Sequence, residues 1–178
     1  MKEDIKEILI SEEQIKNKNI ELGKAIAKHY KGEKLTIICI LKGAVMFMTD
    51  LIKNIDIPLE IDFMDVSSYG EGTTSSGVVK IIKDLDSSIE GKNILIVEDI
   101  IDSGLTLSYL MKILKSRDPK SIEICTLLDK PEGRKIDMDV KYVGFVVPDA
   151  FLVGYGLDFA EKYRNLPYIG ILKEEVYL

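Results

Sequence analysis

The residues whose types and spacing most directly suggest chemistry lie in the segment 94–107. It begins with four aliphatic residues, which predict a buried strand, and continues with two adjacent carboxylates, Glu98 and Asp99. A Ser-Gly-Leu-Thr stretch, Ser103–Thr106, then opens a predicted helix. Carboxylates accept hydrogen bonds from sugar hydroxyls, and backbone N–H groups at a helix N-terminus bind phosphate. Strand, paired acids and loop in this order predict a site for a phosphorylated sugar.

These residues also have purely structural interpretations. Paired acids usually end a strand in solvent, and Ser103 could be the N-cap of the helix with Gly104 in the turn. Here, however, Glu98 and Asp99 follow an entirely apolar strand and precede a phosphate loop, which favours a binding function. Asp102 could likewise cap the helix, although its neighbours favour a role in the site.

The elements that must position this segment follow an alternating pattern of apolar strands and helices. The predicted strands are 35–41, 59–66, 78–83, 93–97, 122–128, 142–147 and 168–172. The predicted helices are 11–31, 44–54 and 105–116, and Ser11 opens the first with a capping box to Gln14. Residues 67–77, rich in Gly, Ser and Thr, are expected to form a mobile loop. The pattern predicts an α/β fold with a parallel sheet and helices on both faces.

Charged residues directly follow several of these strands. Lys42 follows one, Glu98 and Asp99 follow another, and Lys130 follows a third. Ligands of parallel α/β sheets bind outside the carboxyl ends of the strands. We therefore expect these side chains to converge at one edge of the sheet.

Composition narrows the class of protein. A chain of 178 residues fits one domain, and its net charge of −6 argues against broad nucleic-acid binding. The apolar stretch 35–52 is interrupted by Lys42, Gly43 and Asp50, so it predicts a strand and a helix rather than a membrane span. The N-terminus has no signal-peptide core, and we expect a cytoplasmic protein.

Cysteine and histidine provide no catalytic cluster. Cys39 and Cys125 each lie in an apolar run, which predicts buried thiols rather than a disulfide or a metal pair. His29, the only histidine, is expected near the end of a helix. This excludes a His-rich metal site and leaves no basis for a Ser-His-acid hydrolase.

The motif at 94–107 resembles the 5-phosphoribosyl-1-pyrophosphate (PRPP) binding motif of the type I phosphoribosyltransferases. Further segments make the chain similar to the bacterial type of hypoxanthine-guanine phosphoribosyltransferase. They are Leu41-Lys42-Gly43, Ser67-Ser68-Tyr69-Gly70, Lys130, residues 151–158 and Arg164. The resemblance covers nearly the whole chain. It implies one domain, 1–178, with a core at about 35–147, a lid loop at 67–77 and a purine-binding hood formed by the N-terminal residues and 148–178.

The resemblance also implies how PRPP is bound. The implied PRPP-binding residues are Glu98, Asp99, Ser103, Gly104, Thr106, Gly43 and Arg164. Among them, the acid pair binds the ribose hydroxyls and helps to place Mg²⁺, and Asp158 reaches a second Mg²⁺. Lys42 belongs to a loop that contacts pyrophosphate, often through a non-proline cis peptide; the alternative for Lys42 is a solvated loop residue.

The implied catalytic residues are Asp102, Lys42, Ser68 and Tyr69. Asp102 transfers a proton at N7 of the purine, while Ser68 and Tyr69 close over PRPP and exclude water. In the purine pocket, Lys130 donates to a 6-oxo group and Phe151 offers a stacking face. Backbone carbonyls of Leu152 and Asp158 face C2 of the base. The alternative for Lys130 is a surface lysine, and the alternative for Phe151 is a core phenylalanine.

The reaction implied is Mg²⁺-dependent transfer of phosphoribosyl from PRPP to N9 of hypoxanthine or guanine, which yields IMP or GMP and pyrophosphate. The resemblance implies a homo-oligomer, dimer or tetramer, and no nucleic-acid or membrane partner. One alternative is a transferase that prefers xanthine. Another is a regulator that binds PRPP or nucleotide without catalysis, but this acidic chain has no spare length for a DNA-binding module. Asp102, Lys42 and the Ser68-Tyr69 pair favour catalysis.

Overall fold

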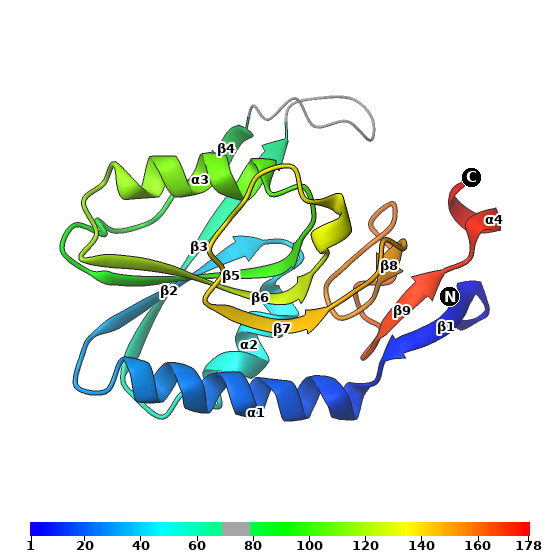
Figure 1. The fold of residues 1–178 in the computed structure, drawn as a ribbon, viewed down its shortest axis with the longest axis horizontal. Helices are drawn as coiled ribbons and strands as arrows, with labels where there is room; N and C mark the ends of the chain where they lie inside the picture. Colours follow the sequence, from blue (N-terminus) through cyan, green and yellow to red (C-terminus); the bar gives the residue numbers. More distant parts are fainter. Residues whose placement is uncertain (69–78) are drawn as a thin grey trace.

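The main feature of the computed structural model is a six-stranded sheet in the order β4-β3-β2-β5-β6-β7 (Figure 1). The structure describes residues 1–68 and 79–178, without the side chain of Ser68. The strands are β2 (Leu35–Leu41), β3 (Leu59–Ser68), β4 (Val79–Lys83), β5 (Asn93–Ile101), β6 (Ser121–Asp129) and β7 (Tyr142–Val146). All neighbours run parallel except β3 and β4, which are antiparallel. The mostly parallel sheet predicted from the sequence is thus confirmed.

Helices cover both faces of this sheet, which is why its central strands are apolar throughout (Figure 1). Helices α1 (Glu12–His29) and α2 (Val45–Ile52) pack on one face, where Ile26 and Phe47 are fully buried. Helix α3 (Leu105–Lys115) packs on the other face through Leu110 and Leu114. The predicted capping box forms at the start of α1, where Ser11 Oγ accepts from the N–H of Gln14.

Both ends of the chain build a second, three-stranded antiparallel sheet in the order β1-β9-β8. It consists of β1 (Ile5–Ile10), β8 (Leu152–Val153) and β9 (Ile169–Leu172), and the short helix α4 (Glu174–Tyr177) follows it. Two 3₁₀ turns, η1 (Lys2–Asp4) and η2 (Pro131–Gly133), complete the described elements. The small sheet lies beyond the end of the main sheet toward which the parallel strands point (Figure 1).

The structure corrects three expectations about the elements. Strand β5 extends to Ile101, so Glu98 and Asp99 lie within the strand rather than after it, because pairing with β6 continues to Asp129. Strands β1 and β8 were not predicted, since they are short and depend on pairing with β9. Helix α2 is shorter at both ends than the predicted 44–54.

The two cysteines and the histidine lie where the sequence predicts. Cys39 and Cys125 are buried free thiols, and burial raises the pKa of Cys39 to about 12, which leaves this thiol unreactive. His29 is the last residue of α1 and is exposed. Among the described residues, no helix has the length and apolar character needed to cross a membrane.

Candidate active site

The candidate site lies between β2 and β5, the neighbouring strands of the main sheet from which the chain continues in opposite directions across the sheet. From β2 the chain continues to its neighbour β3, and from β5 it continues to β6 on the opposite side. The carboxyl ends of β2 and β5 therefore flank the switch point at which α/β sheets bind ligands. Gly43 follows β2 and lies against Asp99, since a Cβ atom on Gly43 would be 1.6 Å from Asp99 Oδ2. Only glycine fits there, and the Leu41–Lys42 peptide before it is cis.

Of the two acids of β5, Glu98 is buried and Asp99 is half-buried, and neither charge is fully compensated. Glu98 is 9% exposed, and burial, followed by the charge of Asp99, holds the pKa of Glu98 well above its usual range. Burial also raises the pKa of Asp99 to about 6, although the Ile100 N–H, 2.7 Å from Oδ1, and the charge of Arg164 oppose this shift. Such a pair disfavours its own ionised form and is suited to a ligand that brings hydroxyl donors or a cation.

The phosphate loop and Glu98 share one cavity of about 240 Å³. Glu98, Asp102, Ser103, Gly104 and Thr106 line it, so the structure brings these five predicted residues together. The N-cap of α3 is Gly104, with φ of +78°, and not Ser103. Ser103 instead accepts from the N–H of Leu105 at 3.4 Å. The N-terminus of α3 opens on the cavity, as a phosphate site requires.

Asp102 is joined to Lys130, which follows β6. Lys130 Nζ lies 3.2 Å from Asp102 Oδ2 and 2.6 Å from Asp149 Oδ1. Burial opposes the charge of Lys130, but hydrogen bonds to Asp149 and Asp102 outweigh it and raise the pKa of this lysine. Gly133 allows the approach of the carboxylate, because a Cβ there would be 1.9 Å from Asp102 Oδ1. The ammonium is thus held between two acids, and Asp102 stays half exposed.

Asp149 is a residue that the sequence analysis missed. It lies three residues beyond the end of β7, so it also follows the carboxyl end of a parallel strand. That position is the signal that could have revealed it, because Lys42, Glu98 and Lys130 were selected on the same criterion.

Arg164 and Asp158 come from the segment after β8. Arg164 Nη2 lies 2.8 Å from Asp158 Oδ1, and Arg164 Nη1 donates to the carbonyl of Gly156 at 2.7 Å. Gly156 packs on the carbonyl of Gly43, where a Cβ would be 2.0 Å away. The charges of Arg164 and Asp158 both act on Asp99, so this segment borders the acid pair.

Other predicted site residues are placed differently. Lys42 points its ammonium at Glu161 Oε1, 3.3 Å away, and both side chains are largely exposed. Phe151 stacks on Tyr177 with ring centroids 4.7 Å apart, and its ring is perpendicular to that of Phe159 at a centroid distance of 5.4 Å. Leu152 is buried in β8.

The fold and this site define an α/β protein with a candidate site for phosphorylated ligands at the switch point of its sheet. A family model, the phosphoribosyl transferase domain, matches residues 7–160, and the chain belongs to this family. It is 64% identical over 177 residues to the hypoxanthine-guanine phosphoribosyltransferase of Bacillus subtilis strain 168, covering 99% of this chain and 98% of that protein. It is 59% identical to the protein of the same description from Staphylococcus aureus strain Mu50, covering 99% of each.

Solved structures agree with these sequence comparisons. A crystal structure of a hypoxanthine phosphoribosyltransferase from Staphylococcus aureus superposes with a TM-score of 0.97 at 58% identity. The match covers 100% of this chain and 97% of that chain. The type I phosphoribosyltransferase fold expected from the sequence is confirmed.

Proposed function

We propose that the protein is a purine salvage enzyme that transfers the 5-phosphoribosyl group of PRPP to N9 of hypoxanthine or guanine. The products are IMP or GMP and pyrophosphate. The observation that carries the proposal is the cavity that combines Glu98 of the acid pair, the phosphate loop and Asp102, with Lys130 bonded to Asp102. The full-length similarity to enzymes described as hypoxanthine-guanine phosphoribosyltransferases supports it.

In this proposal the loop before α3 binds the 5′-phosphate of PRPP through Ser103, Gly104 and Thr106. Glu98 and Asp99 accept hydrogen bonds from the ribose hydroxyls. The pyrophosphate group lies against the loop of Lys42 and Gly43 and the guanidinium of Arg164. The contact of Gly43 with Asp99 supports this arrangement, because it sets the pyrophosphate loop beside the ribose acceptors.

The base is assigned to the side of Lys130. Its ammonium donates to the 6-oxo group, and the carboxylates of Asp102 and Asp149 orient it. Asp102 accepts or returns the proton at N7 and stabilises positive charge that develops on the purine as N9 bonds to C1′. Tyr177 covers one face of Phe151, so we assign the purine to the other face. The carbonyls of Leu152 and Asp158 face C2.

Mg²⁺ is the metal that suits these residues. No cluster of three or more His, Cys, Asp or Glu suitable for a metal occurs in the described part of the chain, 1–68 and 79–178. Mg²⁺ typically uses one or two carboxylates together with substrate phosphates, and Glu98 and Asp99 would hold it, with Asp158 near a second ion. When bound, Mg²⁺ neutralises charge on the pyrophosphate group as it leaves.

Removal of divalent ions is expected to abolish transfer, and added Mg²⁺ is expected to restore it. The acid pair of an acidic protein cannot offset the charge of adjacent phosphates alone. The measurement is pyrophosphate release with and without excess chelator. The melting temperature of the ligand-free protein serves as the control and should not change. Full turnover in excess chelator would exclude the metal role.

Several expectations stay proposals. The closure of Ser68 and Tyr69 over PRPP concerns the Ser68 side chain and residues 69–78, which lie outside the described part of the chain. We also propose a single catalytic domain, 1–178, with its core at about 35–147 and a hood from the N-terminal residues and 148–178. We further propose a homo-oligomer, dimer or tetramer. Buried free thiols suit a reducing compartment, which favours the cytoplasm.

The test is turnover with PRPP, Mg²⁺ and each purine base in turn. Guanine and hypoxanthine should show the highest kcat/KM, because a 2-amino group meets the two carbonyl acceptors and hypoxanthine leaves them to water. The 2-oxo group of xanthine faces those acceptors, at a cost of roughly 1–3 kcal/mol, or about ten- to a hundredfold in kcat/KM. Adenine should give no product, because its 6-amino donor meets the Lys130 ammonium.

Two results would change the proposal. Equal use of xanthine and guanine would favour the xanthine-preferring transferase and would contradict the carbonyl geometry assigned to Leu152 and Asp158. PRPP binding without turnover on any base would favour the non-catalytic regulator.

A further inference from the structure

Tyr155 has an unusual backbone for a buried aromatic residue. Its φ is +47°, and its neighbours Gly154 and Gly156 have φ of +101° and +105°. Three consecutive left-handed residues make a tight turn, and only Tyr155 among them carries a Cβ that disfavours this conformation. The side chain is 8% exposed. Backbone hydrogen bonds, such as that from the Tyr155 N–H to the Leu166 carbonyl at 2.8 Å, and interactions of the buried side chain together hold a backbone that the residue would not adopt by itself.

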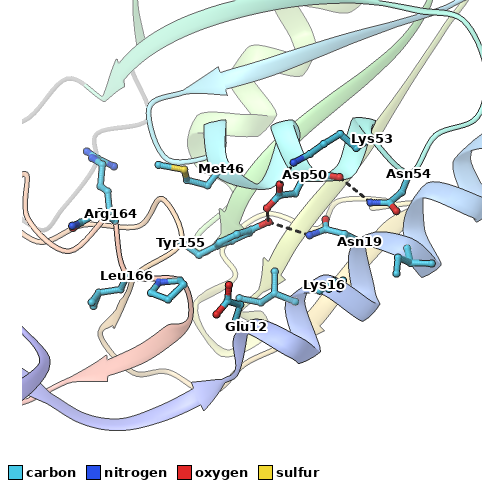
Figure 2. Close-up of a pocket in the computed structure, with 14 residues that line it drawn as sticks. Glu12, Lys16, Asn19, Met46, Asp50, Lys53, Asn54, Tyr155, Arg164 and Leu166 are labelled. Carbon is cyan, nitrogen blue, oxygen red and sulfur yellow. Dashed lines mark hydrogen bonds and ion pairs between the residues drawn. The ribbon is translucent and has the colours of Figure 1, made fainter.

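The hydroxyl of Tyr155 supplies the side-chain hydrogen bonds (Figure 2). It donates to Asp50 Oδ2 at 2.7 Å and accepts from Asn19 Nδ2 at 3.0 Å. Asp50 lies on α2 and Asn19 on α1, so the hydroxyl joins the turn to both helices. Burial opposes the charge of Asp50, but hydrogen bonds from Lys53 and Tyr155 outweigh it and lower the pKa of this carboxyl. The acceptor is therefore a charged carboxylate, which strengthens the bond.

The turn Gly154–Gly156 contacts the residues that are assigned to pyrophosphate. The next residue, Gly156, contacts the carbonyl of Gly43 and exchanges two hydrogen bonds with Arg164. Helix α2, which carries Asp50, begins two residues after Gly43. The bond between Tyr155 and Asp50 thus ties the helix that follows the pyrophosphate loop to the turn that packs on this loop.

We propose that Tyr155 is a positioning residue for the pyrophosphate side of the site. It acts through Gly156 on Gly43 and Arg164 and does not itself touch substrate. The inference rests on the proposed function, since that function assigns Gly43 and Arg164 to pyrophosphate. Asp102 directly follows β5 and Lys130 directly follows β6, and neither is hydrogen-bonded to the Tyr155 hydroxyl. The hydroxyl should therefore affect PRPP and pyrophosphate but not hypoxanthine, which is assigned to Asp102 and Lys130 and leaves the carbonyls of Leu152 and Asp158 to water.

The experiment is steady-state kinetics of Tyr155→Phe in both directions, with each substrate varied. We expect kcat/KM for PRPP and for pyrophosphate to fall roughly ten- to a hundredfold, the range for misplaced binding groups. KM for hypoxanthine should stay within about twofold of wild type. Asp50→Asn keeps an acceptor for the hydroxyl, whereas Asp50→Ala removes it. The fall in kcat/KM for PRPP and pyrophosphate should therefore be smaller in Asp50→Asn than in Asp50→Ala.

The chain offers a matched control in Tyr163. It is also buried and left-handed, with φ of +77°, and its hydroxyl donates to Asp4 Oδ2 at 3.0 Å. Tyr163→Phe loses a hydroxyl–carboxylate bond of the same kind and should keep the wild-type KM for PRPP. Melting temperatures of both variants measure the purely structural cost.

Unchanged kinetics for PRPP and pyrophosphate in Tyr155→Phe would overturn the proposal. An equal rise in KM for base and PRPP, or the same effect in Tyr163→Phe, would also overturn it. Calorimetric titration with pyrophosphate and Mg²⁺ distinguishes failure of the positioning role of Tyr155 from failure of the proposed function. If the wild-type protein transfers phosphoribosyl to no base, weaker pyrophosphate binding by Tyr155→Phe still supports the positioning role, and equal binding rejects it.

Discussion

Replacing Asp102 with Asn is expected to lower kcat for transfer to hypoxanthine by about two to four orders of magnitude, the range for loss of a general acid–base. The amide has the shape of the carboxylate and can still accept a hydrogen bond from Lys130, 3.2 Å away in the wild-type structure. It cannot take up or return the N7 proton. KM for PRPP should change little, because the phosphate loop and the acid pair remain. Single-turnover kinetics measure the chemical step directly.

Asp149→Asn is the matched control for this prediction. Asp149 also holds Lys130, at 2.6 Å, but we assign it no proton transfer. If Asp102 acted only by orienting the lysine, the two variants would lose similar amounts of kcat. We expect Asp149→Asn to raise KM for the base and to keep kcat within about tenfold of wild type. Near-normal turnover of Asp102→Asn would disprove the proposed role.

Replacing Glu98 with Gln and Asp99 with Asn together is expected to weaken PRPP binding while stabilising the ligand-free protein. Neutral amides are poorer acceptors for ribose hydroxyls and poorer ligands for Mg²⁺ than carboxylates. We expect a loss of PRPP affinity of about a hundredfold or more, since each charge-assisted bond contributes roughly 1.5–3 kcal/mol. Calorimetric titration with PRPP and Mg²⁺ measures it.

The gain in stability follows from the raised pKa values of the pair. Burial raises the pKa of Asp99 to about 6, above the usual value of 3.8, so the folded protein binds more protons than the unfolded chain between these pH values. The contribution of Asp99 to the free energy of unfolding therefore falls as pH rises through this window. With each pKa unit equal to about 1.4 kcal/mol, and some discount for partial exposure, the variant should gain about 1–3 kcal/mol at pH 7.

Urea unfolding at pH 4 and pH 7 tests this sign. The difference between variant and wild type should be larger at pH 7. A charge-matched control is Glu60→Gln with Asp84→Asn, whose pKa values are lowered by hydrogen bonds from Lys92 and Arg117. Removing these acids should not stabilise the protein at pH 7 and should leave PRPP binding unchanged. Wild-type stability of the double variant at Glu98 and Asp99 would contradict the claim that burial of these acids destabilises the ligand-free protein.

Such an acid pair illustrates how a site can oppose the stability of its own fold. The first six residues of the strand that carries Glu98 and Asp99 are buried, and no folding advantage explains two acids in this strand. The two acids lower the stability of the ligand-free protein, and a bound ligand then compensates their charge.

The sequence by itself determined the elements whose causes are local. The apolar run of β2 predicted its bounds, Leu35–Leu41, and Ser11 with Gln14 predicted the start of α1 through capping chemistry. The acid pair and the phosphate loop were also recognisable, because a helix N-terminus binds phosphate through adjacent residues. Their convergence with Lys130 followed from the rule that parallel strands end at the same edge of a sheet.

Only the tertiary structure decided the contacts that join distant segments. Pairing with β6 extended β5 past its apolar run and placed the acids inside the strand. The close approach of Gly43 to Asp99 and Gly156, the second carboxylate on Lys130 and the tie from Tyr155 to Asp50 all depend on residues at least 19 positions apart. Such contacts depend on strand register and on how helices and turns pack in three dimensions, and no local pattern of residue types records either.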